Sequence, residues 1–330
     1  MSGFSFSLLI RTLIVALFVW AIVGLACSLI GSTGYGWPTW SQAEVRLSTH
    51  ILPASLIGAA LAAAGVAFQA VLRNPLADPY LLGTSGGAML GAYLWRLPAI
   101  SGIFWIGVLA PQGLALLGAL GATALVLGLA GVRGRIEPVT AILIGVIINS
   151  LCGSAFLLIN AMVRDLPAAG GAMTFFVGDL QTSLPQAYYV TSGVAIAAGF
   201  VGLMMLAPAL NIIRLSDDEA AALGIRVQRA RWSALLCAAI VTAAAVAISG
   251  PIGFIGLICP HIARWFVGND NRRLLPVSAA AGASALAVAD AVSRYLLGVD
   301  RVATVIPVGV VTAVLGGPFF LYLLTRSRRA

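Results

Sequence analysis

Ten apolar segments run through this chain of 330 residues, and they restrict its fold more than any other feature. A helix needs about 20 mostly apolar residues to cross the hydrocarbon core of a bilayer, and most of the segments reach that length. The sequence therefore predicts an all-α polytopic membrane protein with ten transmembrane helices, built as a single domain over residues 1–330. The expected spans are Phe6–Ile30, Ile51–Leu72, Leu81–Leu94, Ile103–Ala130, Val139–Met162, Ala187–Ala207, Ser233–Ser249, Phe254–Val267, Pro276–Leu297 and Val305–Leu324.

Two of these segments, Leu81–Leu94 and Phe254–Val267, are short for a full crossing. Re-entrant or broken helices are the alternative at both places. Pro260 lies inside the second segment and frees a backbone carbonyl there, which favours a break in the helix.

The placement of the arginines predicts the orientation in the membrane. Only 9% of the residues are charged, compared with roughly 25% in soluble domains, so the net charge of +8 does not indicate a nucleic-acid partner. With a cytoplasmic N-terminus, the outer loops hold only Arg46, Arg96, Arg164 and Arg301, and Arg294 lies inside a span. The other fourteen of the 19 arginines are then cytoplasmic. The positive-inside rule thus predicts a multi-pass membrane protein with both termini in the cytoplasm.

The chain contains no lysine, so all 19 basic residues are arginine. A P-loop needs a lysine to reach nucleotide phosphates, and a Schiff-base enzyme needs a lysine amine. The four cysteines are scattered through apolar segments without metal-ligand spacing, and we interpret them as small buried hydrophobes. We expect no catalytic residue, metal site or cofactor in this chain.

Residues 210–231 form a polar cytoplasmic connection that is long enough for two short helices. Ser216 and the three acids after it have the pattern of an N-cap and first helical turn, and Gly224 stands where a C-terminal stop is expected. The segment is either a solvated linker or a docking element for a cytoplasmic partner.

Four stretches together resemble one family. They are QAVLRNPLADPYLLGTSGGAMLGA at 69–92, DDEAAALGI at 217–225, GPIGFIGLICPHIARWFVGNDNRRLLP at 250–276 and PVGVVTAVLGGPFFLYLL at 307–324. They are similar to the FecCD-type permeases of iron-chelate and vitamin B12 ABC importers. The resemblance implies a type II importer permease, not itself an enzyme, that pairs with a second copy into a functional homodimer. It also implies two cytoplasmic ATPase subunits that bind ATP and Mg, and a periplasmic substrate-binding protein.

The resemblance assigns roles to particular residues on both faces. The ATPase-coupling residues would be Asp217, Asp218, Glu219, Ala220, Leu223 and Gly224, within the coupling-helix segment at 210–231. Arg46 and Arg294 would meet acidic residues of the binding protein. The sequence departs from the family pattern where a second arginine is missing after Arg46, near His50, and where Val305 replaces an acid. Both departures lie on the periplasmic side, where partner and cargo are recognised.

Polar residues in the fifth span are candidates for lining the translocation pathway, and hydrogen bonding between helices is the alternative. They are Asn149, Ser150 and Asn160, with Met162 and Arg164 at the outer end. In the ninth span, Asp290 and Arg294 share one helix face at a spacing of four residues, and we expect them to pair because an isolated charge inside a bilayer is costly.

The predicted function is ATP-driven import of an iron chelate, either haem or a ferric siderophore, by alternating access. Cobalamin and a metal oxyanion are the alternative cargoes. A secondary transporter that works without ATP is the alternative class, and it would leave the segment at 210–231 unexplained. An intramembrane enzyme is the third class, but no Ser/His/Asp set, H-E-x-x-H motif or pair of carboxylates occurs within the spans.

Overall fold

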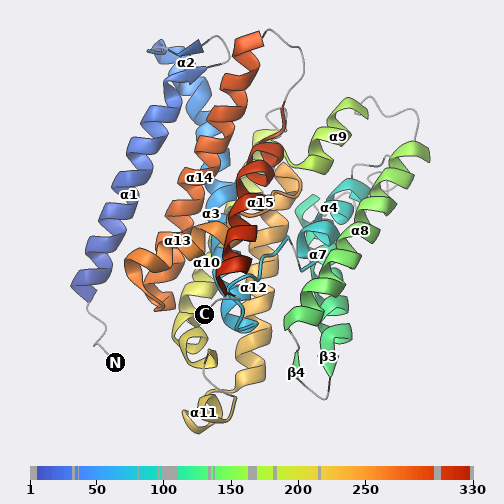
Figure 1. Cartoon of the computed structure of the whole chain (residues 1–330). Helices are drawn as coiled ribbons and strands as arrows, with labels where there is room; N and C mark the ends of the chain where they lie inside the picture. The colour runs from blue at the N-terminus through green and yellow to red at the C-terminus, as the bar shows by residue number, and fades with distance from the viewer. Residues whose placement is uncertain are drawn as a thin grey trace.

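The computed structural model of the chain is a bundle of α-helices with two short antiparallel β-hairpins (Figure 1). It describes residues 6–31, 34–35, 37–80, 82–95, 97, 111–132, 135–136, 138–162, 169–180, 184–214, 217–300 and 306–327. The elements are α1 (Phe6–Ser28), β1 (Ile30–Gly31), β2 (Gly34–Tyr35), α2 (Trp40–Arg46), the π-helix η1 (Leu47–Ile51), α3 (Leu52–Val71), α4 (Thr84–Trp95), α7 (Pro111–Ala130), β3 (Gly131–Val132), β4 (Arg135–Ile136), α8 (Pro138–Met162), α9 (Ala169–Val177), α10 (Gln186–Ile213), α11 (Asp217–Ala222), α12 (Val227–Ser249), α13 (Ile255–Val267), α14 (Asn271–Asp300) and α15 (Val308–Ser327).

Seven of the described helical segments are long and apolar enough to cross a membrane: α1, the continuous α2–η1–α3 segment, α7, α8, α10, α12 and α14. The other three expected spans correspond to the shorter α4, α13 and α15. At 1.5 Å per residue, α4 and α13 are only about 18–20 Å long, against a hydrocarbon core of about 30 Å. The all-α membrane architecture is therefore confirmed, with about ten membrane helices of which seven are long spans, and so is the shortness of two segments.

Local backbone signals explain where these short helices begin. Gly83 has φ +79° directly before α4, and Phe254 has φ 69° directly before α13. The left-handed conformation changes the direction of the chain at the residue where the new helix starts. Phe254 is a bulky residue in this conformation, so the surrounding packing must hold it there.

Some helix bounds differ from the sequence expectation. The fourth span was expected from Ile103, whereas α7 begins at Pro111 and residues 101–110 lie outside the described part. The ninth span was expected from Pro276, but α14 begins earlier because Asp270 caps it, accepting the Arg272 backbone N–H at 3.0 Å. The short helices α2 and α9 were not expected as separate elements.

Helix α3 lies at the centre of the bundle and is almost entirely buried. Its glycines permit backbone contact with two neighbours, since a Cβ atom at Gly58 would lie 2.1 Å from the Gly282 carbonyl oxygen of α14. One at Gly65 would lie 1.9 Å from the Gly256 carbonyl oxygen of α13. Small residues allow such approaches where lipid provides no hydrophobic drive between helices. These two crossings hold α3, α13 and α14 together.

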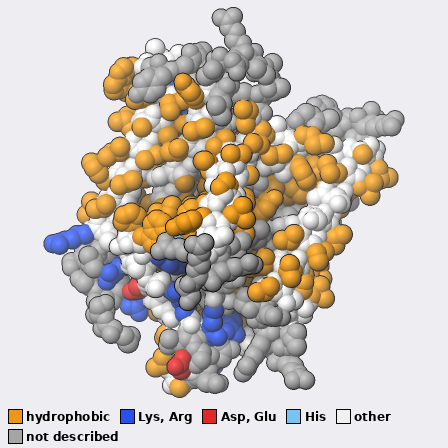
Figure 2. Space-filling view, viewed as in Figure 1, with side chains coloured by type: hydrophobic (Ala, Val, Ile, Leu, Met, Phe, Trp, Pro, Cys, Tyr) orange, Lys and Arg blue, Asp and Glu red, His pale blue; other side chains and the backbone are white. Residues whose placement is uncertain are grey.

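The two ends of the molecule differ in charge. The hairpin β3–β4, α11 and both chain termini lie toward one end of the bundle, and α2 and α9 lie toward the other (Figure 1). Arginine side chains gather near the α11 end in Figure 2, below a broad band of apolar side chains. We call the α11 end the inner face and the α2 end the outer face.

Candidate functional site

The inner face is marked by α11, which projects beyond the ends of its neighbours α10 and α12 (Figure 1). Its C-terminus has the backbone pattern of a Schellman motif. Gly224 has φ +79°, and the Ile225 N–H donates to the Ala220 carbonyl at 3.1 Å. The predicted helical stop at Gly224 is therefore confirmed.

The coupling candidates lie on and just after this helix. Ala220 is fully buried, whereas Leu223 is 62% exposed at the tip and Glu219 is also exposed. Asp217 and Asp218 form the first turn of α11, and their side chains lie outside the described part. An apolar side chain this exposed beyond the apolar band is a typical anchor for a protein partner.

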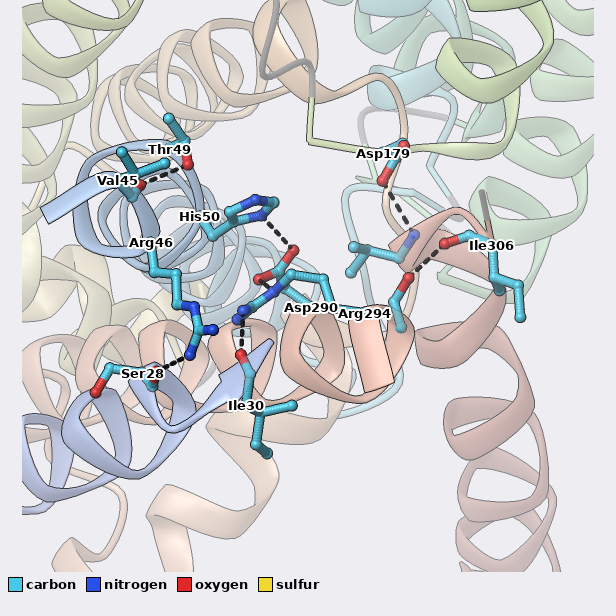
Figure 3. Close-up of polar contacts among 12 residues, drawn as sticks. Ser28, Ile30, Val45, Arg46, Thr49, His50, Asp179, Asp290, Arg294 and Ile306 are labelled. Carbon is cyan, nitrogen blue, oxygen red and sulfur yellow. Dashed lines mark hydrogen bonds and ion pairs between the residues drawn. The ribbon is translucent and has the colours of Figure 1, made fainter. Parts of the chain in front are cut away.

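The outer face carries a polar network between α2, η1 and α14 (Figure 3). Arg294 donates from Nε to Asp290 Oδ2 at 2.9 Å and from Nη1 to the Ile30 carbonyl at 2.6 Å. The predicted pairing of Asp290 with Arg294 is therefore confirmed. Arg46 donates from Nη1 to the Ser28 carbonyl at 2.6 Å. The two arginines thus meet the same β-hairpin region that follows α1.

His50 completes this network, with its Nδ1 3.2 Å from Asp290 Oδ1. The residue lies in η1, where the wider π-helical turn changes the direction of the side chains relative to an ordinary helix. His50 therefore contacts the acid that also binds Arg294. In the sequence, His50 stood out only because it lies near the position of the missing second arginine. Its contact with Asp290, 240 positions away, could not be predicted from any local pattern.

Asp179 is a further outer residue that the sequence did not single out. Its Oδ1 accepts the Val308 N–H at the start of α15, at 3.4 Å, so an acid from a distant loop caps that helix (Figure 3). Burial raises the pKa of Asp179, the Val308 and Leu180 N–H groups lower it, and the nearby Asp290 raises it. Burial is the largest of these effects, so the pKa of this carboxyl lies above its usual range.

A cavity of about 380 Å³ lies between the fifth-span helix α8 and the starts of α13 and α15. Asn149 lines it and bridges two segments, because its Oδ1 accepts the Gly86 N–H at 3.1 Å and its Nδ2 donates to the Tyr80 carbonyl. Phe254 and Val310 line the opposite wall. Asn149 thus bonds across helices, as one of the two interpretations expected, and it also lines this cavity, while its place on a translocation pathway stays a prediction.

The other pathway candidates have different surroundings. Ser150 donates to the Val146 carbonyl of its own helix at 2.9 Å, and Asn160 accepts the Tyr93 hydroxyl at 2.8 Å. Met162 is 75% exposed at the end of α8, and Arg164 lies outside the described residues. Among the described residues, Ser150, Asn160 and Met162 do not line the 380 Å³ cavity with Asn149.

Asp78 lies in the connection between α3 and α4, two residues before the cavity-lining Tyr80, and it is 2% exposed. Its Oδ1 accepts the Tyr80 N–H at 2.7 Å. Burial raises the pKa of Asp78 to about 7, although the N–H groups of Tyr80 and Leu257 lower it. Leu257 belongs to the first turn of α13, so the carboxyl faces the start of that helix, where a negative charge is favourable. With a pKa of about 7, the carboxyl is partly protonated near neutral pH.

The four cysteines were expected to be buried, and two of them are. Cys27 and Cys259 are buried, whereas Cys152 and Cys237 are partly exposed, and all four are free thiols. In the described part of the chain, no three His, Cys, Asp or Glu side chains are grouped so that they could hold a metal ion.

The comparisons with known proteins agree with this architecture. Residues 8–326 match the model of the FecCD transport family. A solved structure described as an inward-facing conformation of a metal-chelate type ABC transporter superimposes with a TM-score of 0.77 and 27% identity, over 96% of this chain and 99% of that one.

Curated relatives carry names for different cargoes. The cobalamin import system permease protein BtuC of Halobacterium salinarum is 37% identical over 88% of this chain and 75% of its own length. The hemin transport system permease protein HmuU of Yersinia pestis is 36% identical over 88% and 84%. The probable siderophore transport system permease protein YfiZ of Bacillus subtilis is 33% identical over 96% of both chains. With a family match across nearly its whole length, this chain belongs to the FecCD transport family and is a permease subunit of an ABC importer, with no catalytic activity of its own.

Proposed function

We propose that this permease imports an iron chelate, haem or a ferric siderophore, across the bacterial inner membrane by ATP-driven alternating access. Two copies form the translocation pathway between them. Two cytoplasmic ATPase subunits, which bind ATP and Mg, contact α11, and a periplasmic binding protein delivers cargo to the outer face. Both chain termini are then cytoplasmic.

The observation that carries this proposal is the arrangement of three features along one axis. An exposed helix lies at the inner face, an arginine network at the outer face, and a cavity between them at the starts of two short helices. Arginines gather at the α11 end (Figure 2), and the positive-inside rule favours the cytoplasm for that end. The exposed apolar surfaces of α8 and α15 would be covered by the second copy.

Cobalamin is the second candidate cargo. Relatives named for cobalamin, hemin and siderophore transport match this chain at 33–37% identity, so identity does not separate these cargoes. The iron chelates rank first because relatives named for iron chelatin, hemin and siderophore transport come from several organisms. Large chelates also suit a wide pathway without a tight binding site.

Cargo uptake by the reconstituted complex tests the proposal. The permease, its ATPase and its binding protein are placed in liposomes, and ATP-dependent accumulation of haem, a ferric siderophore and cobalamin is measured in parallel. Saturable uptake of one iron chelate, abolished without ATP, is expected. Uptake of cobalamin alone would favour the second candidate, and accumulation without the ATPase would contradict the mechanism.

For docking of the binding protein, we propose Arg46 and Arg294. Each already binds a backbone carbonyl near the end of α1, so an acid of the binding protein would replace a neutral acceptor. Nη2 of Arg294 has no hydrogen-bond partner among the described residues, and because this nitrogen is buried, docking must first expose it to such an acid. Charge-assisted bonds are stronger than bonds to neutral carbonyls, which favours the exchange.

Charge changes on α2 are expected to alter docking in opposite directions. Arg46→Glu should weaken binding-protein affinity about tenfold at low ionic strength, because attraction becomes repulsion at the rim of the interface. Glu44→Arg, an exposed position on the same helix, should strengthen it. Both effects should shrink as salt increases. Titration of labelled binding protein against permease in nanodiscs measures them, and equal affinities for both variants at low salt would remove Arg46 from the interface.

A further inference from the structure

Four hydrogen bonds join the end of α10 to the turn between α13 and α14. Asn211 donates from Nδ2 to Asp270 Oδ1 at 2.7 Å and accepts the Asn271 N–H at 2.7 Å. Arg214 donates from Nη1 to the Asn269 carbonyl at 2.9 Å and from Nη2 to Asn269 Oδ1 at 3.4 Å. We call these five residues the inner clasp.

The inner clasp is located where the chain enters α11. Arg214 is three residues before Asp217, the first residue of that helix, so the connection spans at most about 10 Å. The carbonyl of Ile213, the last residue of α10, also accepts the Arg73 Nε–H at 2.8 Å. The segment before α11 is therefore held by both the α13–α14 turn and the end of α3, and a displacement of α11 acts directly on these bonds.

Through Asp270 and Asn271, the clasp is connected to a group of three closely packed helices, α3, α13 and α14. Asp270 caps α14, a helix of 30 residues that extends about 45 Å. Helix α3 touches α14 at Gly58 and α13 at Gly65 through backbone atoms. Helices in contact at backbone distance cannot slide without steric overlap, so α3, α13 and α14 move together.

This group of helices reaches both the outer network and the cavity. Helix α14 carries Asp290 and Arg294 in the outer network, and Phe254, directly before α13, lines the cavity. The clasp bonds are also costly to break, because Asn271 is 1% exposed and water has little access to replace its partner.

We propose that the inner clasp transmits movement of α11 to α3, α13 and α14, and through them to the cavity and the outer network. The inference rests on the proposed coupling role of α11. In this view Asn211, Arg214 and Asp270 are positioning residues that contact neither cargo nor nucleotide. They convert a shift at the ATPase contact into a movement of the helix group.

An exchange of carboxylate and amide tests the clasp. Asn211→Asp places two carboxylates where an amide–carboxylate bond of 2.7 Å exists, so the clasp should open. In the reconstituted complex, the ATP hydrolysed per cargo molecule should then rise about tenfold. Adding Asp270→Asn restores an amide–carboxylate pair with its partners exchanged, and asparagine still caps α14. The double variant should therefore recover coupling near the wild-type value.

Controls separate this role from a purely structural one. Ser284→Ala removes a side-chain bond that stays within α14 and should leave coupling unchanged. Asn211→Ala removes both clasp bonds of that side chain without adding charge. This variant replaces Asn211→Asp in the measurement if Asn211→Asp does not assemble into the complex. Unchanged coupling in either Asn211 variant, or loss of coupling that the exchange does not restore in folded protein, would overturn the proposal. If the wild-type complex hydrolyses ATP but moves no chelate, the proposed function fails and not the clasp.

Discussion

Replacing Asp217, Asp218 and Glu219 together with alanine is expected to uncouple ATP hydrolysis from cargo uptake. These acids occupy the first turn of α11, the helix that projects from the inner face and carries the exposed Leu223 at its end. Loss of three charges from a polar interface removes the attraction between α11 and the ATPase and the contacts that fix how the two align. Cargo moved per ATP hydrolysed should fall about a hundredfold, near the upper end of coupling effects between distinct sites.

The measurement uses the permease–ATPase complex in liposomes, with ATP hydrolysis and uptake recorded on the same sample. Membrane insertion should be unchanged, because the acids lie outside every apolar span. Gln228→Ala, an exposed polar position at the start of α12 on the same face, is the matched control and should retain uptake. Normal uptake by the triple variant would remove these acids from the coupling contact and leave the solvated-linker interpretation.

Gly65→Val is expected to prevent the central helices from packing. A Cβ atom at this position would lie 1.9 Å from the Gly256 carbonyl oxygen, so α3 and α13 must separate to admit any side chain. Overpacking a tight contact costs about 3 kcal/mol or more, and here the contact lies in the middle of the bundle. We expect the yield of monodisperse protein in mild detergent to fall sharply, with the midpoint of thermal unfolding lowered in what remains.

Gly128→Val provides the matched control for this change. Gly128 is an exposed glycine of α7, also inside a helix, and a Cβ atom there would meet no other atom within 4 Å. The two substitutions add the same side chain to the same kind of backbone, so their difference reports the helix crossing alone. Equal yields and equal unfolding midpoints for the two variants would show that α3 and α13 do not require this contact.

Much of the fold was predictable because it depends on local properties of the chain. The long spans follow from runs of apolar residues, the ends of α11 follow from acids and glycine, and the Asp290–Arg294 pair follows from helical spacing. Each of these signals lies within one turn or one span. The boundary of α14 was misplaced because Pro276 was taken as its start, whereas the helix begins at Asn271, where Asp270 caps it, and continues through Pro276.

The candidate sites were predictable only in part. Residue types on the inner and outer faces pointed to docking, and the hydrogen bond of Asn149 to a neighbouring helix was one of the two roles expected for it. The contacts of His50 with Asp290 and of Asp179 with Val308 were not foreseen, nor was the inner clasp. Each joins residues far apart in the sequence, and the sequence contains no local pattern that selects one distant partner over another.

The sequence by itself determined that this is a membrane protein, which segments are apolar enough to span the membrane, and at which end of the bundle the arginines lie. These properties follow from transfer of side chains between water and lipid, and that transfer depends on each segment alone. Only the tertiary structure decided which glycines touch, which backbone carbonyl accepts from Arg294, and how the residue before α11 is bonded to the helices that reach the outer face. Those choices depend on distances between atoms of different helices, which exist only after the helices have packed.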